Sequence, residues 1–171
     1  MRTGKKYKLT DETIQVSGHT LHRIEALKDF GNVKKGDKGG FIEKENILSQ
    51  DGDCWVYNNA KVWGNARVYG NAKICGDALV SDNAVVEENA KVFGNANIYR
   101  NARVWGNAKV YSNASIYGNA DVGITEKPVP SALDVYRGNT ELEITFVNET
   151  PIDTVVVFKR GNAIDTTKLL N

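Results

Sequence analysis

The sequence predicts an all-β fold, a parallel β-helix of about four coils, from three observations. Residues 53–124 divide into twelve consecutive units of six residues. The fourth position of every unit is Val or Ile, and the second is Ala in eleven units and Cys54 in the other. The first position is Asn in ten units and Asp in two. No helical face returns every six residues, whereas a short strand with a tight turn can repeat indefinitely.

The residue types within a unit predict which side chains face inward. The third and fifth positions suit the outward side of a pleat, while Val or Ile points into the interior and Ala sits near the corner. Gly-Asn supplies the turn, because both residues tolerate a positive φ. Three units close a coil of 18 residues, and four coils extend over roughly 19 Å. Burying the twelve β-branched side chains contributes about 20–35 kcal/mol before chain entropy is subtracted, and stacked Asn side chains can add ladder hydrogen bonds.

Both ends of such a prism expose strand edges and need caps. Residues 1–52 are expected to form the N-terminal cap, with a strand over 21–27, a turn over 36–40 and an irregular first coil over 41–48.

Residues 125–171 follow the prism, and two prolines interrupt the pattern there. Three short strands are expected over 133–137, 141–147 and 154–160, as a second cap or a small all-β appendage. No helix is clearly signalled.

Charge and composition exclude several classes of function. The 22 basic and 21 acidic residues nearly cancel, so there is no global attraction to nucleic acid or to an anionic membrane. No signal peptide or membrane span is apparent, and a cytoplasmic location is expected. Cys54, an inward substitute for Ala, and Cys75, on an outward position, do not predict a disulfide.

The run NAKVWGNARVYGNAKICG resembles the hexapeptide-repeat superfamily. The stretches 19–27, 39–45 and 48–50 add a resemblance to the YdcK-like bacterial and prophage proteins, an uncharacterised branch labelled as putative acyltransferases. Together the resemblance covers about residues 7–123. It implies a left-handed β-helix, where the ordinary crossover rule would predict a right-handed one.

The same resemblance implies acyl transfer to an amine or hydroxyl, usually in a trimer with the active site between subunits. That chemistry needs a general base, normally a His on the wall or on an extruded loop. The repeats contain no His and no extruded loop, and the three wall histidines of a carbonic-anhydrase-like metal site are missing too. His19 and His22 remain as candidate bases, although their odd separation places them on opposite faces of a strand, and two polar cap residues are the simpler interpretation.

Every third unit stacks, so each face of the prism presents two outward columns. The first face carries a column with three lysines: Trp55, Lys73, Lys91 and Lys109. Its second column is mainly aromatic: Tyr57, Cys75, Phe93 and Tyr111. Stacked like charges are unfavourable, and an anionic ligand or partner, with stacking on the rings, would relieve them. Alternatively, the lysines splay into solvent over the rings.

The fifth and sixth units, residues 77–88, depart from the rule. They lose the outward aromatics, gain three acidic residues and are expected to expose Leu79 and Val85. This predicts either a partner contact or sequence drift. Residues 36–40 could cradle a phosphate, but without a following helix a plain turn is the simpler interpretation.

The sequence therefore favours a non-enzymatic scaffold or interaction protein of phage or prophage type, without metal or cofactor. It would present the cationic and aromatic face to a protein or a small anionic ligand, and it is expected to be a homo-oligomer, for which the resemblance implies a trimer. The alternative is an acyltransferase that uses acetyl-CoA or another acyl-CoA with His19 or His22 as base. Ice or carbohydrate binding ranks last, since no Thr ladder supports it.

Overall fold

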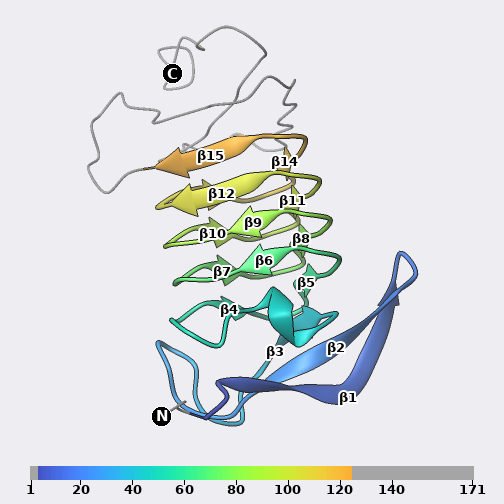
Figure 1. The fold of residues 1–171 in the computed structure, drawn as a ribbon, viewed down its shortest axis with the longest axis vertical. Coiled ribbons are helices and arrows are strands. Elements are labelled where there is room, and N and C mark those ends of the chain that lie inside the picture. Colours follow the sequence, from blue (N-terminus) through green and yellow to red (C-terminus); the bar gives the residue numbers. More distant parts are fainter. Residues whose placement is uncertain (1–3, 125–171) are drawn as a thin grey trace, which may run out of the picture.

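A computed structural model of the chain describes residues 4–124. It consists of fifteen strands and one short 3-10 helix in this range (Figure 1). The first elements are β1 (Tyr7–Val16), β2 (His19–Ala26), β3 (Lys38–Ile42) and the 3-10 helix η1 (Glu45–Ile47). The repeats then form β4 (Trp55–Val56), β5 (Lys61–Val62), β6 (Arg67–Val68), β7 (Lys73–Ile74), β8 (Leu79–Val80), β9 (Val85–Val86), β10 (Lys91–Val92), β11 (Asn97–Ile98), β12 (Arg103–Gly106), β13 (Lys109–Val110), β14 (Ser115–Ile116) and β15 (Asp121–Ile124).

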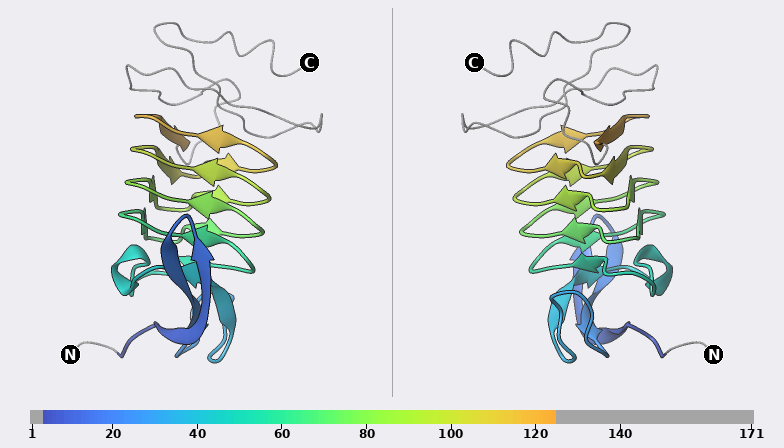
Figure 2. Two further views of the ribbon diagram at one scale, coloured as in Figure 1. Left: turned by 90° about the vertical axis from the view of Figure 1, so that its right-hand side faces the viewer. Right: turned by 90° about the vertical axis from the view of Figure 1, so that its left-hand side faces the viewer.

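Successive strands lie on three different walls, and every third strand pairs in parallel. The first face is the sheet β4-β7-β10-β13, and the third face is β6-β9-β12-β15. The second face continues β5-β8-β11-β14 through β3 into β2 and β1. The chain rises along the axis with a left-handed winding (Figures 1 and 2). The predicted all-β parallel β-helix is confirmed, with four regular coils above an irregular first coil.

The interior contains the small and β-branched side chains that the six-residue period placed there. The Val or Ile and the Ala of each unit are buried throughout residues 56–122. At the end of the first eleven units the backbone enters the left-handed region, as at Gly64 with φ of 72°. Asp82 and Arg100 take the same conformation with φ of 57° and 59°, which is strained for a residue with a side chain.

Asparagine side chains form hydrogen-bonded ladders along the corners, as predicted. Asn65 donates to Asn83 (3.3 Å), Asn83 to Asn101 (3.0 Å) and Asn101 to Asn119 (3.0 Å). Each hydrogen bond joins residues one coil apart, so the ladder stabilises the stacking of successive 18-residue coils.

The N-terminal hairpin of β1 and β2 is attached to the second face. β2 pairs antiparallel with β3, and β3 pairs in parallel with β5. The hairpin therefore leans along the second face of the prism (Figure 2). The strand predicted over 21–27 is β2, and the first coil is irregular as expected, because η1 interrupts it before Leu48 pairs with Val68.

The turn predicted over 36–40 is wrong in its second half. The chain turns at Lys35 and Gly36, but Gly39 and Gly40 lie in β3. A Cβ at Gly39 would lie 2.5 Å from the Val56 carbonyl oxygen, and one at Gly40 would lie 2.4 Å from that of Ala60. These glycines therefore allow β3 to pack against the second coil.

The lower end of the prism is closed by aromatic rings and one lysine. The prediction that Trp55 faces outward is wrong, because its side chain is only 1% exposed. The rings of Tyr7 and Phe30 contact it edge-on, with ring centroids 6.0 and 5.3 Å away. The buried Lys6 ammonium donates to the Cys54 carbonyl (3.0 Å) and lies 5.0 Å from the Phe30 ring centroid. Burial lowers the pKa of Lys6 and raises that of Cys54.

Cys54 and Cys75 are both free thiols, as predicted. Among residues 4–124 no helix is long and apolar enough to cross a membrane. The strands expected over 133–137, 141–147 and 154–160 lie outside the described residues.

Candidate functional sites on the prism faces

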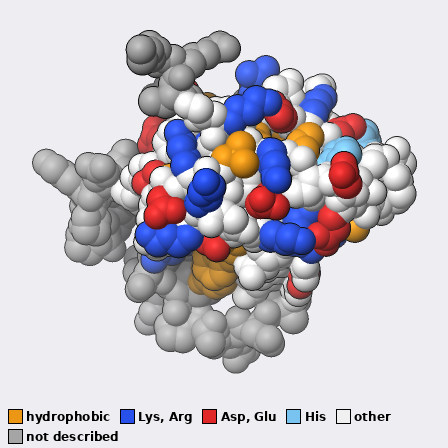
Figure 3. Space-filling view, turned by 90° about the horizontal axis from the view of Figure 1, so that it is seen from below, with side chains coloured by type: hydrophobic (Ala, Val, Ile, Leu, Met, Phe, Trp, Pro, Cys, Tyr) orange, Lys and Arg blue, Asp and Glu red, His pale blue; other side chains and the backbone are white. Residues whose placement is uncertain are grey.

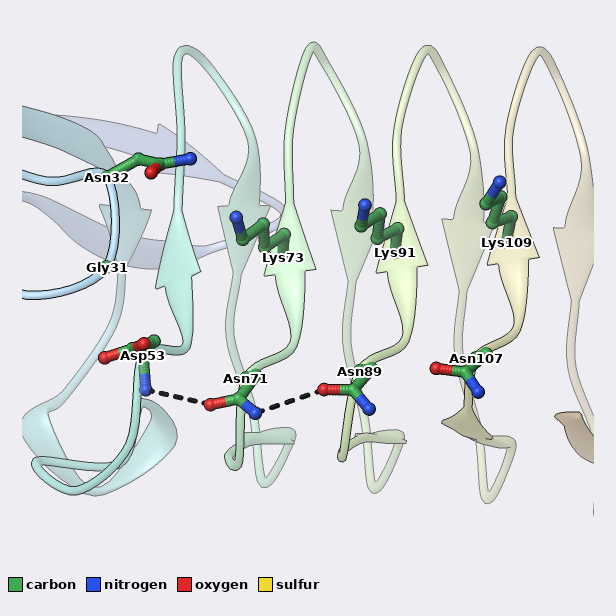
Figure 4. A pocket seen from close by; sticks show the side chains of 9 residues that line it. All are labelled: Gly31, Asn32, Asp53, Asn71, Lys73, Asn89, Lys91, Asn107 and Lys109. Carbon is green, nitrogen blue, oxygen red and sulfur yellow. Dashed lines mark hydrogen bonds between the residues drawn. The ribbon is translucent and has the colours of Figure 1, made fainter. Parts of the chain in front are cut away.

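A groove runs along the first face beside the lysine column (Figure 4). Lys91 pairs in register with Lys73 on one side and Lys109 on the other. The groove has a volume of about 400 Å³. It is lined by Gly31, Asn32, Asp53, Asn71, Lys73, Asn89, Lys91, Asn107 and Lys109.

The lysines of this groove have no acidic partner. Within residues 4–124, the seven ion pairs of the protein involve none of Lys73, Lys91 and Lys109. Among the described residues, Asp53 at the lower end is the only carboxylate in the lining. Neighbouring lysines start one strand spacing apart, about 4.8 Å, well within the screening length of about 8 Å at physiological salt. The column therefore forms a small uncompensated positive region.

The surface around the N-terminal cap has a different charge pattern. Viewed from that end, basic and acidic side chains are interspersed (Figure 3). Pairs such as Lys5 with Glu45 (2.9 Å) and Arg23 with Glu12 (2.7 Å) account for this mixture. Single cations such as Lys61 and Arg67 also lack an ion pair within the described residues, but the first face has three unpaired lysines stacked in register.

The aromatic column of the first face lies beside the groove but does not line it. Phe93 and Tyr111 stack on each other with centroids 5.2 Å apart and planes inclined by 12°. Tyr57 is half-buried against the core, and Trp55 is closed off beneath the cap. Of the seven residues predicted to bind a ligand or partner, the structure brings the three lysines together in one groove and excludes Trp55 from the surface.

A second groove lies where the tip of the β1–β2 hairpin approaches the corner of the second face. It has a volume of about 490 Å³. Its lining is polar apart from one indole: His19, Trp63, Gly64, Asn65, Asp82, Asn83, Arg100 and Asn101.

His19 is held at this groove by Glu43. The His19 Nδ1 lies 2.9 Å from Glu43 Oε1, and the other oxygen of Glu43 accepts from the Gly64 amide at 2.7 Å. The hydrogen bonds from His19 and Gly64 lower the pKa of the Glu43 carboxyl. A carboxylate at Nδ1 orients the ring and leaves Nε2 able to accept a proton. The sequence alone did not identify Glu43, because 24 residues separate it from His19 and only the β2–β3 pairing joins them.

The other histidine has different surroundings. The His22 Nδ1 lies 3.0 Å from the Thr10 carbonyl oxygen, to which it donates, and His22 is not part of either groove. The two histidines therefore occupy separate environments on the hairpin.

On the third face, the cation Arg103 is paired with an acid, whereas Arg67 below it forms no ion pair with a described residue. Arg103 forms a salt bridge with Glu87, which is only 6% exposed. Trp105 Nε1 donates to Asp121 Oδ1 at 2.5 Å. Burial raises the pKa of the Tyr69 hydroxyl, and its hydrogen bond to Glu87 raises it further.

The expected exposure of Leu79 and Val85 is wrong. Both are half-buried, and Ser81 beside them is only 6% exposed. The fifth and sixth units therefore do not present an exposed apolar patch, because neighbouring coils cover much of these side chains.

No family model matches the chain. It is 35% identical over 66 residues to the uncharacterized acetyltransferase YdcK of Escherichia coli strain K12, a similarity that covers 34% of this chain and 20% of that protein. The chain thus spans about a fifth of the length of the curated relative that it matches. The six-residue period and the three-walled coil show a β-helix built from six-residue repeats, an architecture consistent with the hexapeptide-repeat superfamily.

Proposed function

We propose that the chain is a binding protein whose first prism face holds an anionic ligand or an acidic surface of a partner. The single observation that carries this proposal is the column of Lys73, Lys91 and Lys109, stacked in register along a groove without an ion-pair partner in the described residues. An interaction protein of this kind needs no catalytic residue on its walls.

The stacked ammonium groups of the lysine column repel one another. Like charges directly across neighbouring strands destabilise a sheet, so this column opposes folding slightly. A bound anion would convert the repulsion into attraction and would gain charge-assisted hydrogen bonds from several ammonium groups at once. Asn71, Asn89 and Asn107 lie along the same groove. Asn71 Nδ2 donates one N–H to Asn89 Oδ1 at 3.1 Å (Figure 4), so its second N–H is the one it can offer to a ligand.

A matched pair of triple variants tests the proposal. The groove variant is Lys73→Gln, Lys91→Gln and Lys109→Gln, and the control variant is Lys35→Gln, Lys61→Gln and Arg67→Gln, which removes the same charge elsewhere. Calorimetric titration with tripolyphosphate and with poly-aspartate should give at least about tenfold weaker binding for the groove variant. The control should bind like the unaltered protein. Equal binding by both variants would contradict the proposal.

Acyl transfer is a second candidate function, favoured by the His19–Glu43 pair at the second groove. The relative is named as an uncharacterized acetyltransferase. In this proposal His19 Nε2 takes the proton from an amine or hydroxyl acceptor as that group attacks the thioester carbonyl of an acyl-CoA. The C–S bond then breaks, and the CoA thiolate leaves with the proton that His19 returns. Glu43 holds the ring in the required orientation, and we expect a trimer, whose subunit neighbour would complete the substrate site.

Thiol release from acetyl-CoA in the presence of amine and sugar acceptors would test this second function. Loss of a general base typically costs about 100-fold or more in rate. We therefore expect His19→Ala to lose that factor, while His22→Ala retains activity. Absence of turnover by the folded, unaltered protein, or equal effects of the two substitutions, would contradict it. Light scattering would report the oligomeric state.

A further inference from the structure

The groove on the first face is a straight channel between two rows of side chains. The lysine row and the asparagine row both advance by one coil per step, about 4.8 Å, and both run along the prism axis (Figure 4). Three ammonium groups therefore extend over about 10 Å. A compact anion can meet one or two of them, whereas a linear anion along the axis can meet all three.

The two ends of the groove differ. At the lower end, Asp53 lines it with Gly31 and Asn32 of the N-terminal cap, and the Asp53 amide donates to Asn71 Oδ1 at 3.3 Å. The Asp53 carboxylate repels an anion, so the ligand is held away from this end. Asp53 stands where ten of the twelve units have Asn, and this departure from the repeat places a negative charge in the groove, the only one there within residues 4–124.

The side chains of the lining end in polar groups, while the aliphatic stems of the lysines supply its apolar surface. Its side chains are ammonium and amide groups with one carboxylate, and no aromatic or aliphatic side chain lines it among the described residues. Single-stranded nucleic acids gain much of their affinity from bases stacked on aromatic rings. Phe93 and Tyr111 stack on each other and lie outside the groove. Without a ring in its lining, the groove is better suited to a ligand that is charged along its whole length than to one held by base stacking.

An acidic peptide fits the spacing poorly. Side chains on one face of an extended peptide recur about every 6.6 Å, out of step with lysines that recur about every 4.8 Å. A flexible chain with a negative charge on every monomer needs no such register, because some charged oxygen lies near each ammonium.

We infer that the groove of Lys73, Lys91 and Lys109 binds linear polyphosphate along the prism axis. This inference rests on the proposed function, anion binding by the first face, and adds the class of ligand. The ammonium groups contact successive phosphate oxygens, the amides of Asn71, Asn89 and Asn107 donate from the opposite row, and Asp53 sets the end of the bound segment.

Titration of the full chain with orthophosphate, tripolyphosphate and long-chain polyphosphate tests the inference. We expect affinity to increase along this series, and to exceed by about tenfold the affinity for oligothymidylate or poly-aspartate of equal charge. Affinity falls as the salt concentration rises, and each single Lys→Gln substitution should make the slope of log affinity against log salt less steep by about 0.7. The control triple variant at Lys35, Lys61 and Arg67 should leave that slope unchanged.

Asp53→Asn provides a test by gain of binding. The substitution restores the residue of the other units and removes the repulsive charge, so it should tighten polyphosphate binding several-fold. Unchanged or weaker binding by this variant would overturn the placement of the ligand. Lysine-dependent binding that favours oligothymidylate or poly-aspartate would overturn the inference but leave the proposed function standing. Absence of lysine-dependent binding to every probe would overturn both.

Discussion

The first and third faces of the prism use the same six-residue frame but differ in their upper coils, where the third face pairs Arg103 with an acid and the first face leaves its lysines unpaired. On the third face, Arg103 pairs with the buried Glu87, and Asp121 accepts a hydrogen bond from Trp105. On the first face, Lys73, Lys91 and Lys109 have no such acid within the described residues. The frame requires only Val or Ile, Ala, Asn and Gly at set positions, so outward residues are free to pair or to remain unpaired. An unpaired column opposes stability and therefore indicates a role outside folding.

The largest expected effect lies at the base of the first face. Trp55→Ala removes a fully buried indole from beneath Tyr7 and Phe30 and should lower the free energy of unfolding by about 3–5 kcal/mol. Trp63→Ala, at a half-buried indole on the second face, is the control and should cost clearly less. Urea denaturation followed by circular dichroism measures both, and equal losses would show that the cap does not hold Trp55 as described.

The next largest loss of stability is expected from breaking the ion pair of Glu87 and Arg103 on the third face. Glu87→Gln weakens the salt bridge of a buried carboxylate with Arg103 and should cost about 1–3 kcal/mol. Glu88→Gln removes the same charge from the adjacent, exposed position and should be nearly neutral. If the two substitutions have the same effect on the denaturation midpoint, the third face is not stabilised by this pair.

Close packing on the third face can be tested at Gly123. A Cβ there would lie 2.0 Å from Trp105 Cε2, so Gly123→Ala must displace the ring and should cost about 1–3 kcal/mol. Gly4→Ala is the control, because nothing lies within 4 Å of the Cβ that it would add. A neutral Gly123→Ala would contradict the packing of Trp105 across the last coil.

The contribution of the second face to the free energy of unfolding should depend on pH. The pKa of Glu43 is lowered from 4.5 in the folded protein by His19 and the Gly64 amide. Its ionised form therefore contributes stability above that value, and the contribution is lost as the pH falls through the lower folded-state pKa. Glu43→Gln should flatten this acid limb of the stability profile, and His19→Ala should flatten it in part. His22→Ala should leave it unchanged; a change as large as that of His19→Ala would exclude the assigned pairing.

The smallest change in stability, a gain where the other substitutions cause a loss, is expected at the middle of the lysine column. Lys91→Gln removes repulsion from both neighbours and should raise the free energy of unfolding by about 0.2–1 kcal/mol at low salt. The gain should shrink at high salt, where the charges are screened. Lys61→Gln on the second face is the control and should show no such salt dependence. A destabilising Lys91→Gln would mean that the first face contributes to folding like the third.

Much of the prism could be predicted from the sequence, because its information is local and repeats. Val62 is buried and Trp63 is not, since their alternation within one unit sets opposite directions. The stacking of Lys73, Lys91 and Lys109 follows from three units per coil. Glu87 was harder to interpret, because its partner Arg103 is a diagonal neighbour 16 residues away, and side-chain direction decides whether they meet.

The N-terminal cap has no period, and only the tertiary structure decided its contacts. Trp55 sits at a position that faces outward in every other unit, yet Tyr7 and Phe30 bury it, because the open end of the prism needs an apolar cover. The strand position of Gly39, and the approach of His19 to Glu43, depend on pairing between segments far apart in the chain. A repeat determines its own contacts from a few residues, whereas a cap is shaped by the surface that it must cover.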